Sequence, residues 1–140
     1  MYEDVLTALA DAHVRFVVTG GVAVVLHGCP RSVPDLDVVV DPAPANLDAT
    51  TASLARLGFW PTIPLPLAAV VVLRTMDAHG REVDVNRVYT IPFQALSGQA
   101  AVVTIEGRAI SVISKDDLIA VKLQRGRGYD LEDVALLRSA

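Results

Sequence analysis

The sequence has a single cysteine and no long apolar segment, which argues against a disulfide-stabilised protein and against a membrane-spanning one. Cys29 is the only cysteine in 140 residues, so an internal disulfide is impossible and a reducing compartment is expected. No run approaches the roughly 18 uninterrupted apolar residues that a membrane helix needs. The first residues, 1–4, lack the basic start of a signal peptide. These features predict a cytoplasmic protein without a membrane segment.

Lysine is also scarce. Only two of the 12 basic residues are lysines, Lys115 and Lys122, and both lie close to Arg125 and Arg127. The formal net charge is −4. Strong non-specific binding of nucleic acid needs many cationic phosphate contacts, so the charge argues against it. The clustered cations near the C-terminus still allow a local basic patch.

What the sequence does contain predicts one folded domain over residues 1–140. Apolar residues make up 52% and charged residues 20%, which suits a packed core and excludes a disordered chain. Periodicity and turn residues predict helices at 2–12, 22–27, 45–57, 115–125 and about 130–138, a helical turn at 91–96, and strands at 14–19, 33–40, 67–76, 82–88, 101–105 and 108–113. The proline-rich segment 59–66 should be an irregular loop. We therefore expect an α/β (α+β) fold with a mixed sheet flanked by helices.

Two aspartates in the second predicted strand carry the strongest chemical signal. Asp35 and Asp37 are two residues apart, so they share one face of the strand, roughly 7 Å apart at Cα, while Leu36 enters the core. Two carboxylates held so close repel each other. A hard divalent cation such as Mg²⁺ removes that repulsion, because carboxylate oxygens are its preferred ligands. The alternative is that one aspartate ends the strand and both face solvent.

A third aspartate lies in a later strand. Asp84 has a valine on each side, so those neighbours bury the opposite face of the strand. If Asp84 looks toward the first two aspartates, the three complete a two-metal site of the kind that holds both the attacking and the leaving oxygen of a phosphoryl displacement. The alternative is the polar side of a hairpin, since Glu82 and Asn86 share that face.

A glycine pair lies between the first strand and the first short helix. Gly20 and Gly21 let backbone N–H groups approach a phosphate closely, and a helix start adds a favourable partial charge. A tight turn without a ligand explains the pair equally well.

These residues belong to two longer patterns. The first consists of Gly20-Gly21-Val22-Ala23-Val24, His27-Gly28, Arg31 and Asp35-Leu36-Asp37. The second consists of Lys122-Leu123, Arg125, Arg127, Asp130-Leu131 and Asp133. Together they resemble the DNA polymerase β-like nucleotidyltransferase superfamily, and within it the small bacterial members of the abortive-infection and toxin–antitoxin type. The resemblance runs from about residue 16 to 137, and the proline-rich middle shows none.

The resemblance implies a nucleotidyltransferase core. Asp35, Asp37 and Asp84 would hold Mg²⁺ or Mn²⁺, and the phosphates of an NTP would bind near Gly20 and Gly21. The chain departs from the family at two places. Many members have serine where Gly21 stands, with its hydroxyl on a phosphate. Relatives also often carry threonine in the segment 32–34, which here reads Ser-Val-Pro. Both departures leave the metal ligands in place and bear on the efficiency of catalysis.

Four further residues allow two interpretations each. Lys122 shares a helix face with Lys115 and is either a phosphate contact or part of a solvated surface. Arg31 is either a triphosphate contact or one half of a surface salt bridge. Asp130 is more typical of a helix N-cap than of a ligand. Trp60 has the ring to stack on a base, although a single loop tryptophan usually packs.

We therefore expect an enzyme that transfers an NMP from an NTP to a hydroxyl of RNA, above all tRNA, or of protein, with pyrophosphate leaving. A toxin–antitoxin or abortive-infection role would add a cognate protein partner. The first alternative is an antitoxin-like regulatory module with the same fold and little activity. The second is a metal-dependent phosphohydrolase, which needs a histidine among the ligands. No histidine stands near the aspartate strands in sequence.

Overall fold

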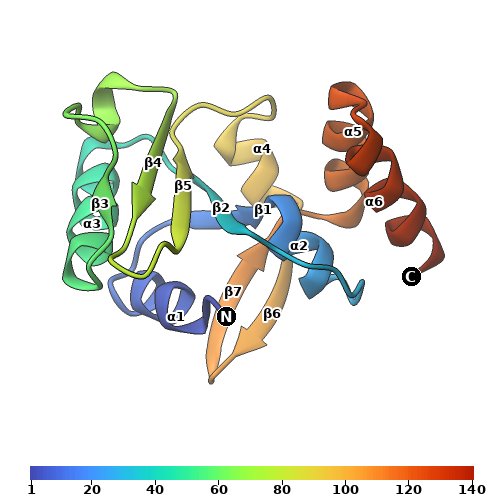
Figure 1. Ribbon diagram of the computed structural model, residues 1–140, viewed down its shortest axis with the longest axis horizontal. Coiled ribbons are helices and arrows are strands. Elements are labelled where there is room, and N and C mark those ends of the chain that lie inside the picture. The colour runs from blue at the N-terminus through green and yellow to red at the C-terminus, as the bar shows by residue number, and fades with distance from the viewer.

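The computed structural model describes all 140 residues and centres on one mixed sheet (Figure 1). The strands are β1 (Phe16–Thr19), β2 (Asp35–Val40), β3 (Trp60–Pro61), β4 (Val72–Met76), β5 (Glu82–Asn86), β6 (Ala101–Ile105) and β7 (Arg108–Val112). The helices are α1 (Glu3–Asp11), α2 (Gly20–Leu26), α3 (Pro44–Arg56), the 3-10 helix η1 (Leu67–Ala69), α4 (Phe93–Gly98), α5 (Lys115–Arg125) and α6 (Gly128–Ser139). The predicted α/β architecture is confirmed.

The seven strands are ordered β3-β4-β5-β2-β1-β7-β6. The pairs β2–β5 and β1–β7 are parallel, and all other neighbours are antiparallel. This order makes β3 and β6 the two edges of the sheet. It also brings β2 and β5 together although a helix, β3 and β4 separate them in sequence.

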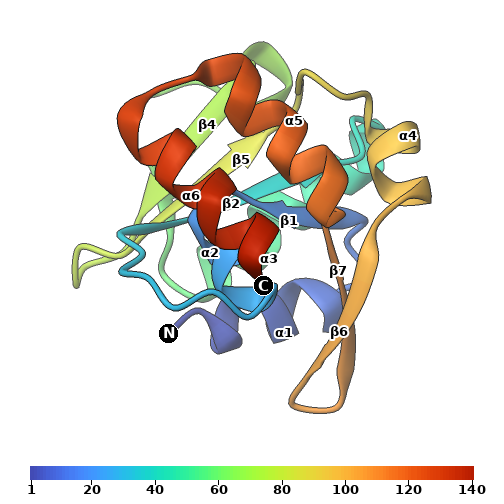
Figure 2. The same cartoon turned by 90° about the vertical axis from the view of Figure 1, so that its right-hand side faces the viewer.

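The core holds 30 buried apolar residues. β1 is buried over its full length and β2 from residue 38 onward, as continuous β-branched runs are when both faces of a sheet are covered. α1 and α3 contact each other, and α5 and α6 lie side by side at the far end of the molecule, beyond α2 (Figures 1 and 2). The longest helix, α3, has 13 residues, and none of the helices is both long and apolar enough to cross a membrane.

Two sequence-based expectations for the middle of the chain are wrong. The segment 67–76 was expected to be one strand, but it begins as η1 and becomes β4 only at Val72. A short apolar run does not distinguish strand from helix by periodicity. Trp60–Pro61, expected in an irregular loop, forms the edge strand β3 against β4. An edge position tolerates the missing N–H of a proline.

Helix ends also differ from expectation. α2 begins at Gly20, two residues early, and α6 begins at Gly128 with Arg127 as its N-cap. Asp130 is therefore inside the first turn of α6, where its carboxylate accepts a hydrogen bond from the Arg127 N–H at 3.3 Å. The prediction for α5 is confirmed: the Ser114 hydroxyl oxygen accepts a hydrogen bond from the Asp117 N–H at 3.1 Å, and Gly126 ends the helix with φ 64°.

Candidate active site

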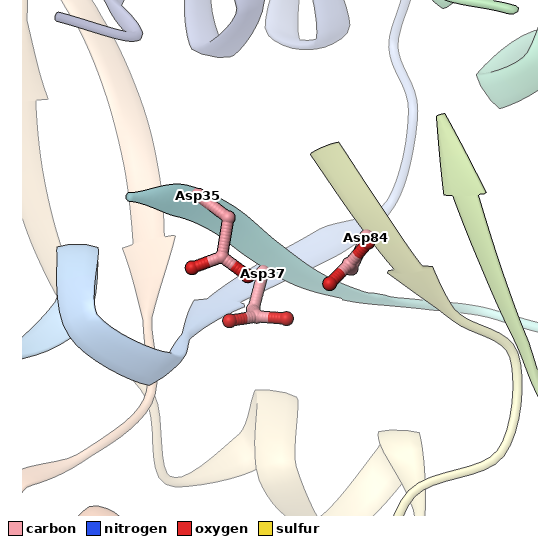
Figure 3. Close-up of side chains that lie close together, drawn as sticks. All are labelled: Asp35, Asp37 and Asp84. Carbon is pink, nitrogen blue, oxygen red and sulfur yellow. The ribbon is translucent and has the colours of Figure 1, made fainter. Parts of the chain in front are cut away.

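The three aspartates meet on one face of the sheet. In the parallel β2–β5 ladder, Asp37 is the direct partner of Asp84, and Asp35 is the partner of Glu82. Paired residues project from the same face, and Figure 3 shows the three aspartate side chains pointing toward a common point. Each offers a carboxylate oxygen, and these oxygens all lie within 4.8 Å of one another. The three aspartates that the sequence analysis singled out thus lie together in the structure.

Burial and mutual repulsion make the cluster costly as bare charges. Burial first, and then the charges of Asp35 and Asp84, raise the pKa of Asp37 to about 7. The pKa of Asp35 is also raised, first by burial and then by Asp84. An all-oxygen donor set with excess negative charge suits a hard divalent cation such as Mg²⁺ or Mn²⁺.

The backbone of Gly20 lies directly against the carboxylate cluster. It has φ +66°, a conformation that other residues adopt only with strain. A Cβ atom at this position would lie 2.5 Å from Oδ2 of Asp37 and 3.1 Å from its Cβ. The first residue of α2 is therefore a glycine because the backbone passes against a metal-ligand candidate. The glycine turn therefore also leaves room for the carboxylate of Asp37.

Gly21 lies against Arg31. A Cβ atom at position 21 would be 3.3 Å from Nη1 of Arg31 and 3.3 Å from Cγ1 of Val33. The Arg31 guanidinium thus lies next to the position where a larger residue would place its side chain. Nη1 also donates to Oδ2 of Asp133 at 2.6 Å. Arg31 is half-buried and forms an ion pair with a buried partner, Asp133 of α6, and not with an acid on the open surface.

Lys122 is neither on a solvated surface nor beside Lys115. Its side chain is 3% exposed, and Nζ lies 2.8 Å from Oδ2 of Asp133 and 3.7 Å from Oδ1 of Asp130. Lys115 instead reaches the C-terminal carbonyl oxygen of Ala140. Lys122 and its two acidic partners form a buried ionic cluster that joins α5 to α6. The C-terminal sequence pattern contained these residues but not their pairing.

Most of these groups line one polar cavity of about 520 Å³, although Asp84 and Asp133 are not part of its lining. Only one of the eleven lining residues is apolar, and the lining contains five cations: Arg31, Arg74, Lys122, Arg125 and Arg127. Gly20, Gly21, Asp35 and Asp37 line the same space. The cavity therefore combines a carboxylate cluster with cations and a helix start, the features that a metal-bound polyphosphate requires.

Sequence reasoning missed Arg74. In the β4–β5 ladder it is the direct partner of Asp84. Its Nε atom donates to Oδ1 of Asp84 at 3.2 Å and lies 3.2 Å from Oε2 of Glu82. An arginine two residues from the end of a predicted hairpin strand carries no signal by itself. Its role follows from the register of the hairpin, which the sequence leaves open.

Comparisons with known proteins agree with this geometry at the level of the fold. No protein-family model and no curated protein matches the sequence. Among solved structures, the lincosamide antibiotic adenylyltransferase LnuA with bound lincomycin is 18% identical, with a TM-score of 0.69 over 96% of this chain and 92% of that one. The antibiotic-resistance factor ANT(2'')-Ia is 14% identical, with a TM-score of 0.70 over 97% of this chain and 80% of that one.

A third structure extends the comparison beyond antibiotic resistance. An antigenic nucleotidyltransferase-like protein from Paracoccidioides brasiliensis is 17% identical, with a TM-score of 0.61 over 96% of this chain and 72% of that one. At such low identities the likeness establishes the fold alone, and that fold is the one shared by nucleotidyltransferases. The resemblance inferred from the sequence is confirmed to that extent. None of the three is described as a toxin or an antitoxin.

Proposed function

We propose that this protein is a metal-dependent nucleotidyltransferase that transfers an NMP from an NTP to a hydroxyl acceptor. The observation that carries the proposal is the convergence of Asp35, Asp37 and Asp84, whose oxygens lie within 4.8 Å of one another beside a cavity lined by Asp35, Asp37 and five cations. Three clustered carboxylates can hold a metal, and the glycines that begin α2 can contact phosphate. Together they suit a metal-bound triphosphate better than either feature does alone.

In this proposal the three aspartates hold Mg²⁺ or Mn²⁺, which when bound neutralises charge on the phosphates. The N–H groups of Gly20 and Gly21 and the side chains of Arg31 and Lys122 bind and orient the triphosphate. Asp84 accepts the proton of the acceptor hydroxyl. The acceptor oxygen forms a bond to the α-phosphorus while the bond from that phosphorus to pyrophosphate breaks, so pyrophosphate leaves.

The acceptor class includes three candidates. RNA and protein hydroxyls follow from the sequence resemblance, together with a cytoplasmic toxin–antitoxin or abortive-infection role and a cognate partner. Small molecules follow from the neighbours, since LnuA is described with lincomycin and another ANT(2'')-Ia structure contains adenylyl-2''-tobramycin. A net charge of −4 favours the small molecules over a large RNA surface.

One observation favours a second candidate function, a non-catalytic regulatory module with this fold. Both cations expected to bind phosphate are already held by Asp133, with Arg31 at 2.6 Å and Lys122 at 2.8 Å. A nucleotide would have to compete with that carboxylate or bind the cations through their remaining N–H donors.

The deciding experiment incubates the protein with each α-labelled NTP, Mg²⁺ and one acceptor class at a time: total RNA, total protein, or a small-molecule extract. Label transfer that depends on metal and is absent from Asp84→Asn supports the enzyme. Absence of transfer with every NTP and acceptor class, together with saturable nucleotide binding by calorimetry, supports the regulatory module instead.

A further inference from the structure

The carboxylate face of the sheet continues past the aspartates into an apolar surface. The ladders place Trp60, Met76, Glu82 and Asp35 in one row across β3, β4, β5 and β2, because each is the direct partner of the next. The next row on the same face, two residues further along the strands, contains Arg74, Asp84 and Asp37. Directly paired residues share a face, and the contact of Arg74 with both Asp84 and Glu82 confirms that β4 and β5 present these residues on the same side.

Two paired residues of this face form what we call the apolar platform: Trp60 and Met76. Their exposed fractions are 63% and 38%. Large apolar side chains that are exposed singly are ordinary, whereas neighbouring ones beside a polar site are a candidate binding surface. β3 is the edge of the sheet, so no further strand pairs beside Trp60. Trp60 is also the only tryptophan in the protein.

The platform and the phosphate-binding cations lie on opposite sides of the carboxylates. Across the sheet the order is β3 and β4, then β5 and β2 with the aspartates, then β1, whose end leads into Gly20 and Gly21. Four of the five cavity cations come from the loop before β2 or from α5 and α6. The fifth, Arg74, comes from β4 and is held by Glu82 and Asp84.

The geometry of phosphoryl transfer gives the platform side and the cation side of the carboxylates different roles. In a phosphoryl displacement the attacking and leaving oxygens are roughly in line. In the proposed function the glycine turn and the cations near α5 and α6 receive the pyrophosphate side of the nucleotide, so the attacking hydroxyl must arrive from the opposite side, across Asp84 and β4. We propose that the apolar platform binds the body of the acceptor, and that this acceptor is a small hydroxyl compound with an apolar ring or face. This inference rests on the proposed nucleotidyltransferase function.

Charge and size select the acceptor class. The charged neighbours of the platform are Glu82, Asp84 and Arg74, and the guanidinium of Arg74 is engaged by the two carboxylates. Arg74 is one cation against these two carboxylates, so the local charge is negative; a neutral or cationic molecule fits there, and a phosphate backbone would be repelled. Trp60 stands two strands from Glu82, about 10 Å at the usual strand spacing, and about 12 Å from Asp84, which lies two residues further along β5. A molecule of two rings spans that distance.

The fluorescence of Trp60 tests binding without any need for turnover. Titrations would use lincomycin, tobramycin and phenyl glucoside as hydroxyl compounds of two or more rings, with the single-ring glucose and the oligoribonucleotide hexaadenylate as comparisons. We expect a saturable change in Trp60 emission with at least one of the first three compounds at millimolar concentration, retained in Val102→Ala at the opposite edge of the sheet and lost in Met76→Asp. The proposal is overturned if none of the three compounds changes the emission, or if only hexaadenylate does.

Kinetics test the platform separately from the catalytic centre. With the acceptor found by label transfer, Trp60→Ala should raise the acceptor KM by roughly tenfold, which corresponds to about 1.4 kcal/mol. The KM for the NTP should stay within about twofold, less than 0.5 kcal/mol. Val102→Ala is the matched control, because Val102 is 65% exposed on β6 at the opposite edge of the sheet. Melting temperatures of all variants check that they fold.

The outcomes separate this inference from the proposed function. If transfer occurs and Trp60→Ala keeps the acceptor KM of the parent, the platform is not the acceptor site while the enzyme stands. If ring-bearing compounds bind but no nucleotide binds or transfers, the proposed function fails and a ligand-binding surface remains. If Trp60 emission instead depends on protein concentration and Trp60→Asp turns a dimer into a monomer, a second copy covers the platform and the acceptor proposal is wrong.

Discussion

The carboxylate of Asp37 lies directly against the backbone of Gly20, at a position where a methyl group would come within 2.5 Å of Oδ2. Gly20→Ala therefore combines two costs: a left-handed φ for a residue with a Cβ, about 1–2 kcal/mol, and displacement of Asp37. Gly80→Ala is the matched control, since Gly80 has φ +80° but nothing within 4 Å of its Cβ position. In chemical denaturation Gly20→Ala should be the less stable variant. Equal losses of stability would show that the contact with Asp37 carries no strain.

The carboxylate cluster predicts a specific response to metal. Mg²⁺ or Mn²⁺ should raise the melting temperature of the parent, because a ligand that binds only the folded state stabilises it by mass action. The double variant Asp35→Asn/Asp37→Asn should fold and lose that rise. Asp48→Asn, an exposed change on α3, should keep it. The same rise in the double variant would remove the argument for a metal at this site.

The raised pKa of Asp37 predicts a pH dependence for the metal-free protein. With a folded pKa of about 7 against an ordinary 3.8, the stability that a neutral Asp37 contributes is complete below about pH 3.8 and is lost as pH rises to about 7. Asp37→Asn remains neutral throughout. In EDTA, its stability relative to the parent should therefore increase between pH 5 and pH 7 by up to about 1.4 kcal/mol per pH unit, then level off. Asp48→Asn should show no such trend.

Asp84 should separate stability from activity. Asp84→Asn removes one of three clustered negative charges, so the metal-free variant should melt at the temperature of the parent or slightly higher. NMP transfer should fall by at least about a hundredfold, because a group that acts on the transition state has been lost. Paired measurements of melting temperature and NMP incorporation provide the check. Full activity in the variant would point to Glu82, the partner of Asp35 on the same face, as the third ligand.

Asp133 should prove essential to the α5–α6 pair. It is buried, and its carboxylate contacts both Arg31 at 2.6 Å and Lys122 at 2.8 Å. Asp133→Asn leaves Lys122 with only the longer contact to Asp130, and breaking a buried ion pair of this kind typically costs about 3–5 kcal/mol. Glu132→Gln, an exposed neighbour, should cost less than about 0.5 kcal/mol. The check is urea unfolding of the parent, Asp133→Asn and Glu132→Gln. Equal free energies of unfolding in all three would show that the ionic cluster is solvated.

Local rules were enough to predict much of the fold and part of the site. The period of two along a strand placed Asp35 and Asp37 on one face, and periodicity together with turn residues predicted α5 at 115–125. Both depend on neighbours a few residues away. The glycine pair at the start of α2 was also recognisable, because a strand, a break and an apolar helix follow one another directly in the chain.

Only the tertiary structure decided the long-range relationships. Whether Asp84 faces Asp37 depends on the register of the parallel β2–β5 pair, and a slip of one residue would turn Asp84 to the other face. The sequence allowed Lys122 to be a phosphate contact or a surface residue and did not pair it with Asp133. Packing of α5 against α6 buries both residues, and their burial then forces them to pair. Trp60 reads as a loop residue until β3 joins the sheet edge and aligns it with Met76. Sequence patterns report local periodicity, whereas these contacts arise from how distant segments align, and that alignment is determined by packing of the whole chain.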